Sequence, residues 1–320
     1  MINMINGIPA KALLIIAILF SVALCSVLLK LFKGKLPKDQ GREFAFNGKL
    51  SAGKVRGAGI IFVCSFIAVS LIFVPFSLEY LFYYILLFLG MLSGYLDDAS
   101  EKPWGEYKKG AIDLVISALT AANFVYFNPE LTSISLFGFS VKIPAILFGV
   151  IGTVLVWMLI NATNCSDGID GFCGSLSIVS MIAIAAAVYF ANGDSNVTML
   201  VILMVVTLLP YLWSNSEPST MMMGDAGSRA LGLFLCICIL KTGNILLTIP
   251  LCFMLCLDGL LGIVKISLIR FLKIKNAFKN IRTPLHDHFR KNKGWSNSQV
   301  IFRFCMIQAV ISAVTVVAIR

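Results

Sequence analysis

Charged side chains are scarce in this sequence. Asp, Glu, Lys and Arg make up only 13% of its 320 residues, whereas 58% are hydrophobic. A soluble domain has about a quarter charged and about half apolar residues. This shortage of charge, with a mean hydropathy of +0.91, excludes an ordinary soluble protein. It predicts an integral membrane protein with the lipid bilayer as its surroundings.

Acidic residues are the scarcer charge, because 16 Asp and Glu face 26 Lys and Arg and leave a net charge of +10. In a soluble chain such an excess would indicate a nucleic-acid partner. In a protein that crosses the membrane many times it instead collects in the cytoplasmic loops. We therefore expect no nucleic-acid partner and use the basic residues to assign orientation.

The nine cysteines form no recognisable pairing pattern. No two are separated by two residues, and most lie inside apolar runs, as Cys236 and Cys252 do. Cysteines in such runs are typical of small hydrophobic side chains. The sequence therefore predicts neither a disulfide framework nor a cysteine metal site.

Ten mostly apolar runs approach the length of about 20 residues that a membrane-spanning helix needs. The first has no small-residue cleavage site after it, so we expect a retained helix rather than a signal peptide. The eighth run is short, and the ninth carries Asp258 and Lys265. The runs are residues 12–29, 57–76, 80–96, 111–127, 144–160, 175–191, 197–213, 228–241, 245–269 and 300–319.

The basic residues assign these runs to two sides of the membrane, because cytoplasmic loops retain Lys and Arg. If the ten runs are helices, 22 of the 26 basic residues fall on connections that share one side or on the helix ends that border them. The exceptions are Lys11, Lys142, Lys241 and Arg320. We therefore predict an all-α integral membrane protein of about ten transmembrane helices, a single domain over residues 1–320, with both termini external.

The longest external connection, residues 128–142, has an alternating polar and apolar pattern from Ser133 to Val141. Alternation of this kind is typical of strands. We predict a small external β-hairpin with Gly138 near its turn.

Acidic residues gather at three points on the predicted cytoplasmic side. Asp97 and Asp98 follow the third run, Asp167 and Asp170 follow the fifth, and Asp225 follows the seventh. Each feature alone has an ordinary explanation, either a solvated helix end or a tight turn with an Asp cap. Five carboxylates at helix ends on one side instead indicate a site that holds a ligand.

The residue types in these segments suit a phosphate substrate and a divalent cation. Adjacent carboxylates such as Asp97 and Asp98 repel each other and attract a proton or a cation. Mg²⁺ binds hard oxygen ligands, typically one or two carboxylates together with substrate phosphates. Glycines beside Asp170 and Asp225 let backbone amides approach an anion closely.

The last cytoplasmic connection holds the only two histidines, His286 and His288. If this segment is extended, both side chains lie on one face. They could be metal ligands or solvated loop residues, but contacts to phosphate or pyrophosphate fit an Mg²⁺ site better. Carboxylates, glycine turns, histidines and basic residues on one side indicate phosphoryl transfer at the membrane surface, with an apolar co-substrate.

Asp258 is an acid inside an apolar run and therefore a candidate functional residue. Lys265 lies seven residues, about two helical turns, further along. We favour a structural role for Asp258, paired with Lys265 through an intermediary or with a backbone group.

A secondary transporter is an alternative of another class. Transporters of that kind are built from internal repeats and carry ionisable residues near the middle of the bilayer. No repeat is evident, and most charges lie at helix ends, which favours an enzyme.

These motifs, in this order, resemble those of the polyprenyl-phosphate N-acetylhexosamine-1-phosphate transferase superfamily, over most of the chain. The shared motifs are Asp97-Asp98, residues 161–171 and residues 223–228. Residues 284–289, with residues 293–296 and 300–304 after them, resemble its phospho-N-acetylmuramoyl-pentapeptide transferase subgroup in particular.

The resemblance implies a ten-helix enzyme of the bacterial plasma membrane with its active site facing the cytoplasm. It implies transfer of phospho-MurNAc-pentapeptide from UDP-MurNAc-pentapeptide to undecaprenyl phosphate, which yields lipid I and UMP in peptidoglycan synthesis. Mg²⁺ is the implied cofactor, and a homodimer is a possible assembly. The alternative within the superfamily is transfer of GlcNAc-1-phosphate from UDP-GlcNAc to a polyprenyl phosphate.

The resemblance also implies roles for individual residues. Asp97, Asp98 and Asp225 take the catalytic positions, with Asp97 as the base that deprotonates the lipid phosphate and Asp225 as the Mg²⁺ ligand. The implied substrate-binding residues are Asn164, Asp167, Gly168 and Asp170 near the nucleotide and metal, Asn215 and Met222 at the uridine, His286 and His288 at the phosphates, and the basic residues Lys109 and Lys49.

The chain departs from the superfamily pattern in three places. The connection after Asp98 is short, so the pairing of Lys102 and Lys109 with the family's basic residues stays open by one or more positions. Three consecutive histidines followed by Phe-Glu are usual where this chain has His286-Asp287-His288 followed by Phe-Arg. A Thr-Pro-Thr-Met-Gly-Gly segment is usual where residues 54–59 read Lys-Val-Arg-Gly-Ala-Gly.

Overall fold

The computed structural model describes residues 9–39, 41, 51–136, 139–191, 193–274, 276 and 278–319. Lys49, Gly138 and Arg320 lie outside the described residues. The elements in chain order are α1 (Ala10–Phe32), η2 (Lys33–Lys35), α2 (Gly59–Phe73), α3 (Leu78–Asp98), α4 (Glu106–Phe127), η4 (Pro129–Leu131), β1 (Ser133–Leu136), β2 (Phe139–Lys142), α5 (Ala145–Ser166), α6 (Phe172–Phe190), α7 (Ser195–Asn215), α8 (Gly224–Leu240), η5 (Ile245–Leu247), α9 (Thr248–Leu251), α10 (Phe253–Arg270), α11 (Leu285–Lys293) and α12 (Asn297–Ala318).

The protein is an all-α membrane protein, and each of the ten apolar runs forms helix. Within the described residues, seven helices are long and apolar enough to cross a membrane, namely α1, α3, α4, α5, α6, α7 and α12. The bent pair of α9 and α10 is an eighth candidate, and α2 is a shorter apolar helix. The predicted hairpin is confirmed, since β1 and β2 pair antiparallel with Ser133 opposite Lys142 and Leu136 opposite Phe139.

Helix α8 lies at the centre of the bundle. Every one of its residues is buried, and α3, α5 and α2 pack around it. Gly94 of α3 touches the backbone of Asp225 in α8, and a Cβ at that position would overlap the Asp225 carbonyl. The last turn of α3 and the first turn of α8 are therefore held together, backbone against backbone.

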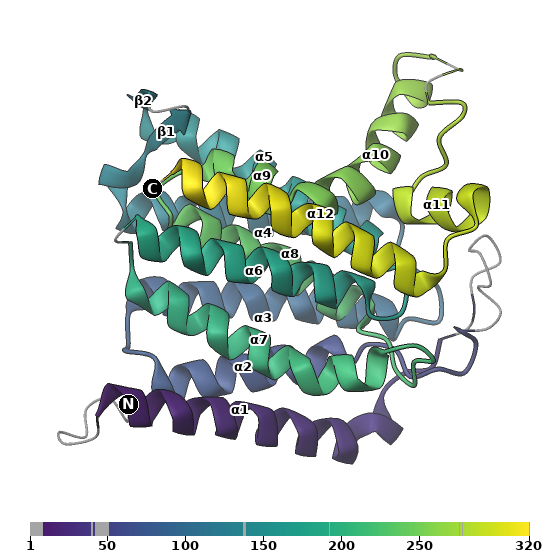
Figure 1. The fold of residues 1–320 in the computed structure, drawn as a ribbon, viewed down its shortest axis with the longest axis horizontal. Helices are drawn as coiled ribbons and strands as arrows, with labels where there is room; N and C mark the ends of the chain where they lie inside the picture. Colours follow the sequence, from purple (N-terminus) through teal and green to yellow (C-terminus); the bar gives the residue numbers. More distant parts are fainter. Residues whose placement is uncertain are drawn as a thin grey trace.

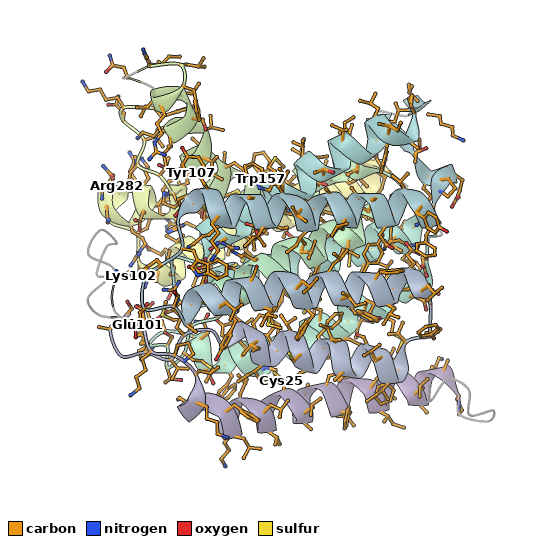
Figure 2. The ribbon with its side chains drawn as sticks, turned by 180° about the vertical axis from the view of Figure 1, so that it is seen from behind. Cys25, Glu101, Lys102, Tyr107, Trp157 and Arg282 are labelled. Atoms are coloured by element: carbon orange, nitrogen blue, oxygen red, sulfur yellow. The ribbon has the colours of Figure 1, made fainter. Side chains whose placement is uncertain are left out.

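The two ends of the bundle differ in character (Figure 1). The N-terminal end of α1, the C-terminal end of α12 and the β1–β2 hairpin lie at one end, which we call the hairpin end. Helix α11 and the long connections lie at the opposite end, the site end. Glu101, Lys102, Tyr107 and Arg282 mark the site end in Figure 2.

The ninth run is a bent pair of helices rather than one straight helix, because α9 and α10 meet at an angle of 91°. Such a bend frees backbone groups that an apolar environment cannot hydrate. The amide of Gln308 in α12 donates to the carbonyls of Pro250 and Leu251, each at 3.0 Å, and accepts from the Met254 amide at 2.8 Å. Gln308 thus supplies the hydrogen bonds that the bend removes, and α10 leaves the bundle (Figure 1).

Lys241 ends α8 at the hairpin end and is buried with its charge paired. Its Nζ donates to Glu79 Oε2 at 2.9 Å and to Asn128 Oδ1 at 2.9 Å, and lies 3.6 Å from Asp194 Oδ2. The Asn128 amide also donates to Glu79 Oε1 at 2.7 Å. Lys241, a basic residue on the predicted external side, is therefore accounted for by its buried partner Glu79.

Replacing this lysine should destabilise the fold. Lys241→Ala leaves the Glu79 carboxylate buried without its cation, which costs about 3–5 kcal/mol in comparable pairs. We expect a clearly lower melting temperature in detergent, while Lys142→Ala on the exposed end of β2 leaves it unchanged. Equal melting temperatures for the two variants would contradict a structural role for the Lys241 cluster.

Candidate active site

Three carboxylates that the sequence singled out come together at the site end. Asp97 and Asp98 are the last two residues of α3, and Asp225 lies in the first turn of α8. Asp97 and Asp225 are each only 5% exposed, and the Asp98 side chain is fully covered. Buried carboxylates need compensating partners, and each of these three has them.

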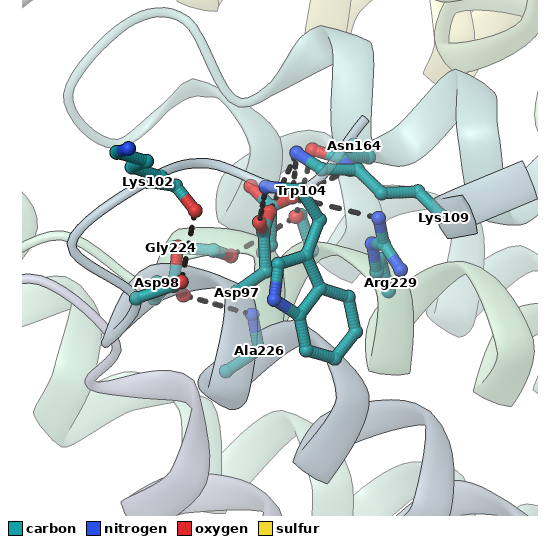
Figure 3. A network of polar contacts seen from close by, with 12 residues as sticks. Asp97, Asp98, Lys102, Trp104, Lys109, Asn164, Gly224, Ala226 and Arg229 are labelled. Carbon is teal, nitrogen blue, oxygen red and sulfur yellow. Dashed lines mark hydrogen bonds and ion pairs between the residues drawn. The ribbon is translucent and has the colours of Figure 1, made fainter. Parts of the chain in front are cut away.

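Asp97 and Asp225 share a lysine, and Figure 3 shows Asp97, Trp104, Lys109 and Asn164 close together. Lys109 Nζ lies 2.5 Å from Asp97 Oδ2 and 3.4 Å from Asp225 Oδ2. The backbone amide of Trp104 donates to Asp97 Oδ1 at 2.7 Å. The side-chain Nδ2 of Asn164 donates to Asp225 Oδ2 at 3.4 Å. The structure thus brings Lys109 and Asn164 into contact with the carboxylate cluster.

Arg56 is the second cation of the cluster, and sequence reasoning did not identify it. Its Nε donates to Asp98 Oδ1 at 2.7 Å, and its Nη2 donates to Asp225 Oδ1 at 3.2 Å. The backbone amide of Ala226 donates to the other Asp98 oxygen at 3.1 Å. Burial alone would lower the pKa of Arg56, but Asp98, Asp225 and Asp39 raise it above its usual value. The guanidinium therefore stays charged.

Arg229 is the third cation and reaches Asp225 from within α8. Its Nη2 lies 3.6 Å from Asp225 Oδ2, and its Nη1 lies 3.1 Å from Asp113 Oδ1 in α4. The charge count along the sequence assigned Arg229 to a loop, whereas the structure buries it inside the bundle. Its buried partner Asp113 explains how the charge is tolerated.

The cations determine the ionisation of Asp225. Burial alone would raise the pKa of this carboxyl, but Lys109, Arg229 and Arg56 outweigh burial and hold the pKa at about 2. Asp225 is therefore a carboxylate at neutral pH. A permanently ionised carboxylate is suited to holding a divalent cation.

The segment after α5 is more helical than the sequence suggested. Helix α5 continues to Ser166, so Asn164 lies on its last turn rather than in a loop. Asp170 pairs with Lys54 Nζ at 3.0 Å and accepts from the Ser219 amide at 3.2 Å. Asp167, which lies between Asn164 and Asp170 in the sequence, is half-buried.

Asn215 lies near the same segment, but its side chain is fully used by backbone groups. Its Oδ1 accepts from the Gly171 amide at 2.8 Å, and its Nδ2 donates to the Met221 carbonyl at 2.8 Å. Met222 is half-buried, and its amide donates to the Val55 carbonyl at 2.7 Å. These contacts tie the Gly171 turn to residues 54–59.

The structure separates the two histidines. They lie in helix α11 rather than in an extended segment, and side chains two residues apart on a helix point to different faces. His286 is buried and touches Gly168, where a Cβ would overlap its ring. His288 instead accepts from the Arg282 amide at 3.3 Å. The expectation of one shared face was wrong, because the helix rotates His288 away.

Asp258 pairs with His286 and not with Lys265, and the predicted alternative of a backbone partner is confirmed by the His286 amide. Its two oxygens meet the His286 amide at 2.6 Å and the ring Nδ1 at 2.8 Å. Lys265 donates instead to the Ile281 carbonyl at 2.7 Å. Because a carboxylate accepts hydrogen bonds, the contact assigns a proton to Nδ1 and leaves Nε2 facing Gly168.

Two of the residues that sequence reasoning missed carried a signal that could have identified them. Asp113 and Arg229 are charged residues near the starts of apolar runs, where an unpaired charge is costly. Each therefore required a partner, and together they are that pair. Arg56 is one of eight basic residues in a single connection, and Asp39 lies in the same connection. Composition alone could not single out either residue.

The chain matches the family model "Glycosyl transferase family 4" over residues 80–243, the part that carries Asp97, Asp98 and Asp225. It is similar to the phospho-N-acetylmuramoyl-pentapeptide-transferase of Treponema pallidum (strain Nichols). The two chains are 36% identical over 295 residues, which is 87% of this chain and 81% of the relative.

A more distant relative has the same name. The phospho-N-acetylmuramoyl-pentapeptide-transferase of Wolbachia sp. subsp. Drosophila simulans (strain wRi) is 26% identical over 277 residues, 81% of this chain and 82% of the relative. With a buried carboxylate cluster at one end of an apolar helical bundle, these matches show that the chain belongs to glycosyl transferase family 4 and, within it, to the phospho-N-acetylmuramoyl-pentapeptide-transferases.

Proposed function

We propose that this protein transfers phospho-MurNAc-pentapeptide from UDP-MurNAc-pentapeptide to undecaprenyl phosphate, forming lipid I and releasing UMP. The observation that carries the proposal is the buried cluster of Asp97, Asp98 and Asp225 where apolar helices end, in a chain of this family. A charged nucleotide sugar and a lipid-linked phosphate can both reach such a position. Phosphoryl transfer depends mainly on positioning and charge neutralisation, which this cluster is built to supply.

We propose that the chain crosses the bacterial plasma membrane ten times, with both termini external and the site end in the cytoplasm. Two observations support this arrangement. The N-terminal end of α1 and the C-terminal end of α12 lie at the same end of the bundle (Figure 1). The connections at the opposite end carry most of the basic residues, as cytoplasmic loops do.

The cluster is suited to a divalent cation because its carboxylates outnumber its cations. The carboxylates of Asp39, Asp97, Asp98, Asp113 and Asp225 face the cations of Arg56, Lys109 and Arg229. Five carboxyl groups face three cations, and this excess of acidic groups favours a divalent cation. The ammonium of Lys109 lies where Asp97 and Asp225 converge, so it stands in for a cation there.

Asp225 would therefore hold the Mg²⁺, with Lys109 turned toward the substrate phosphates. Among the described residues no three His, Cys, Asp or Glu side chains converge on one point. Substrate phosphate oxygens and water would complete the coordination, as is usual for Mg²⁺. When bound, the ion would neutralise charge on the pyrophosphate.

In the reaction, an oxygen of the lipid phosphate attacks the phosphorus that carries the sugar. The bond from this phosphorus to the UMP oxygen breaks, and UMP leaves with the electron pair. Asp97 would accept the proton of the lipid phosphate, since the Trp104 amide fixes its Oδ1. Direct attack is favoured over a covalent Asp98 intermediate, because both Asp98 oxygens are hydrogen-bonded and its side chain is fully covered.

We assign the surrounding residues to substrate binding by their positions. Asn164, Asp167, Gly168 and Asp170 border the cluster on the α5 side. Asn215 would shape the uridine pocket rather than contact the base, because its amide is already bonded, and Met222 would line that pocket. His286 would donate to a substrate phosphate through Nε2 only with both ring nitrogens protonated, because Nδ1 already pairs with Asp258. His288 and Lys49 remain predictions, and a homodimer rests on the resemblance alone.

A direct test is UMP release by the protein in detergent with undecaprenyl phosphate. UDP-MurNAc-pentapeptide and UDP-GlcNAc are offered in parallel, each with Mg²⁺ and with EDTA. We expect release from the first substrate only, and only with Mg²⁺. Release from UDP-GlcNAc alone would change the assigned sugar, and no release from folded protein would refute an enzymatic function.

The carboxylates should be required for turnover but not for insertion. Asp97→Asn and Asp225→Asn remove a charge at the site end while keeping the shape of each side chain. We expect UMP release to fall at least about 10³-fold, because electrostatic stabilisation usually contributes more to catalysis than any other single effect. Detergent-purified yield should stay near normal. Loss of folding in either variant would mark that residue as structural.

The Asp258–His286 pair offers a milder perturbation. Asp258→Asn disturbs the proton on His286 Nδ1, and loss of such an orienting partner typically costs about 10–100-fold. We expect kcat to fall in that range, while Lys273→Ala, on the exposed connection after α10, leaves kcat unchanged. An unaltered kcat in Asp258→Asn would exclude the pair from the reaction.

A further inference from the structure

Each edge of the Arg56 guanidinium meets a different carboxylate. Its Nε bonds to Asp98 Oδ1 at 2.7 Å, its Nη2 to Asp225 Oδ1 at 3.2 Å, and its Nη1 to Asp39 Oδ1 at 3.2 Å. These carboxylates come from the end of α3, the start of α8 and the connection after α1. We infer that Arg56, anchored by Asp39, is a positioning residue that fixes Asp98 and Asp225 for the transfer. This rests on the proposed function.

The backbone around Arg56 is held on both sides. Val55 forms an antiparallel bridge with Lys38 and a parallel bridge with Met221. The Arg56 amide donates to the Pro37 carbonyl at 2.9 Å, and the Ala58 amide donates to the Met222 carbonyl at 3.1 Å. Hydrogen bonds on both sides of this extended segment fix the backbone position from which the Arg56 side chain reaches the carboxylates.

Asp39 anchors the far side of the guanidinium. It is 5% exposed, and its Oδ2 accepts from Ser51 Oγ at 2.5 Å and from the Gly41 amide at 3.3 Å. Its own amide donates to the Lys54 carbonyl at 2.8 Å. In the described part of the chain its contact with the carboxylate cluster runs through Arg56. A change at Asp39 should therefore reach the cluster by way of Arg56.

The geometry favours positioning over substrate binding. Arginine binds phosphate through a pair of parallel donors, whereas here each of the three nitrogens donates to a separate carboxylate. The Arg56 side chain is only 17% exposed. A lysine donates from a single nitrogen and cannot reproduce the planar fork whose three nitrogens each meet a different carboxylate. Without Arg56, the carboxylates of Asp98 and Asp225 would repel each other where the end of α3 meets the start of α8.

This feature belongs to the segment in which the chain departs from the superfamily pattern. Arg56 lies where the second threonine of the usual Thr-Pro-Thr-Met-Gly-Gly segment is expected.

The test compares Arg56→Gln, Arg56→Lys, Asp39→Asn and the double variant Asp39→Asn/Arg56→Gln in the UMP-release assay. We expect kcat to fall about 10²-fold in Arg56→Gln, the size of effect that small misplacements produce. The KM for the nucleotide substrate should change less than about twofold, and Arg56→Lys should not rescue kcat. The double variant should be no slower than Arg56→Gln, because residues that act through one contact are not additive.

Lys38→Gln is the matched control, since it removes a charge from an exposed side chain next to Asp39 and should leave kcat unchanged. Hydrogen exchange gives a second readout, because the Ala226 amide bonds to Asp98 and should exchange faster in Arg56→Gln. A raised KM with normal kcat, or effects of Asp39 and Arg56 that multiply, would overturn the inference. A wild type that releases no UMP would refute the proposed function instead.

Discussion

Neutralisation of buried carboxylates is the constraint on which this structure depends. Helices α3 and α8 place Asp97, Asp98 and Asp225 in a covered position, where unpaired charge would be costly. The compensating cations come from three separate segments, with Arg56 before α2, Lys109 at the start of α4 and Arg229 within α8. The connection after α1 and the one between α3 and α4 must therefore pack onto the site for the fold to be stable.

The same principle explains the other irregular features of the bundle. Gln308 satisfies the backbone at the bend between α9 and α10, and that bend turns α10 out of the bundle near α11. Asp258 in α10 then meets His286 in α11, which brings the histidine against Gly168. A polar side chain inside the apolar region thus helps to position a site residue some distance away. Architecture and chemistry are connected through hydrogen bonds that the apolar surroundings make obligatory.

Much of this arrangement could be predicted from sequence because hydrophobic runs and acidic motifs are local patterns. The runs gave ten helical segments, and the motifs around Asp97, Asp170 and Asp225 gave the end of the bundle where the site lies. Pairings between distant segments were not predictable, since Arg56 and Asp225 are separated by 169 positions. The pairing of Asp258 with His286 required the break in the ninth run, and the helical state of α11 decided which histidine faces the site. No local pattern in the sequence signals either feature.

Binding of one divalent cation at the carboxylate cluster is the most direct test of its proposed role. Mn²⁺ can replace Mg²⁺ at oxygen-ligand sites, and its electron paramagnetic resonance signal reports the free ion during a titration of the purified protein. We expect one Mn²⁺ per chain, displaced by Mg²⁺ and weakened at least about tenfold in Asp225→Asn because a charged oxygen ligand is lost. Undiminished Mn²⁺ binding in Asp225→Asn, or no binding to the wild type in the presence of nucleotide substrate, would contradict a metal-binding role for the cluster.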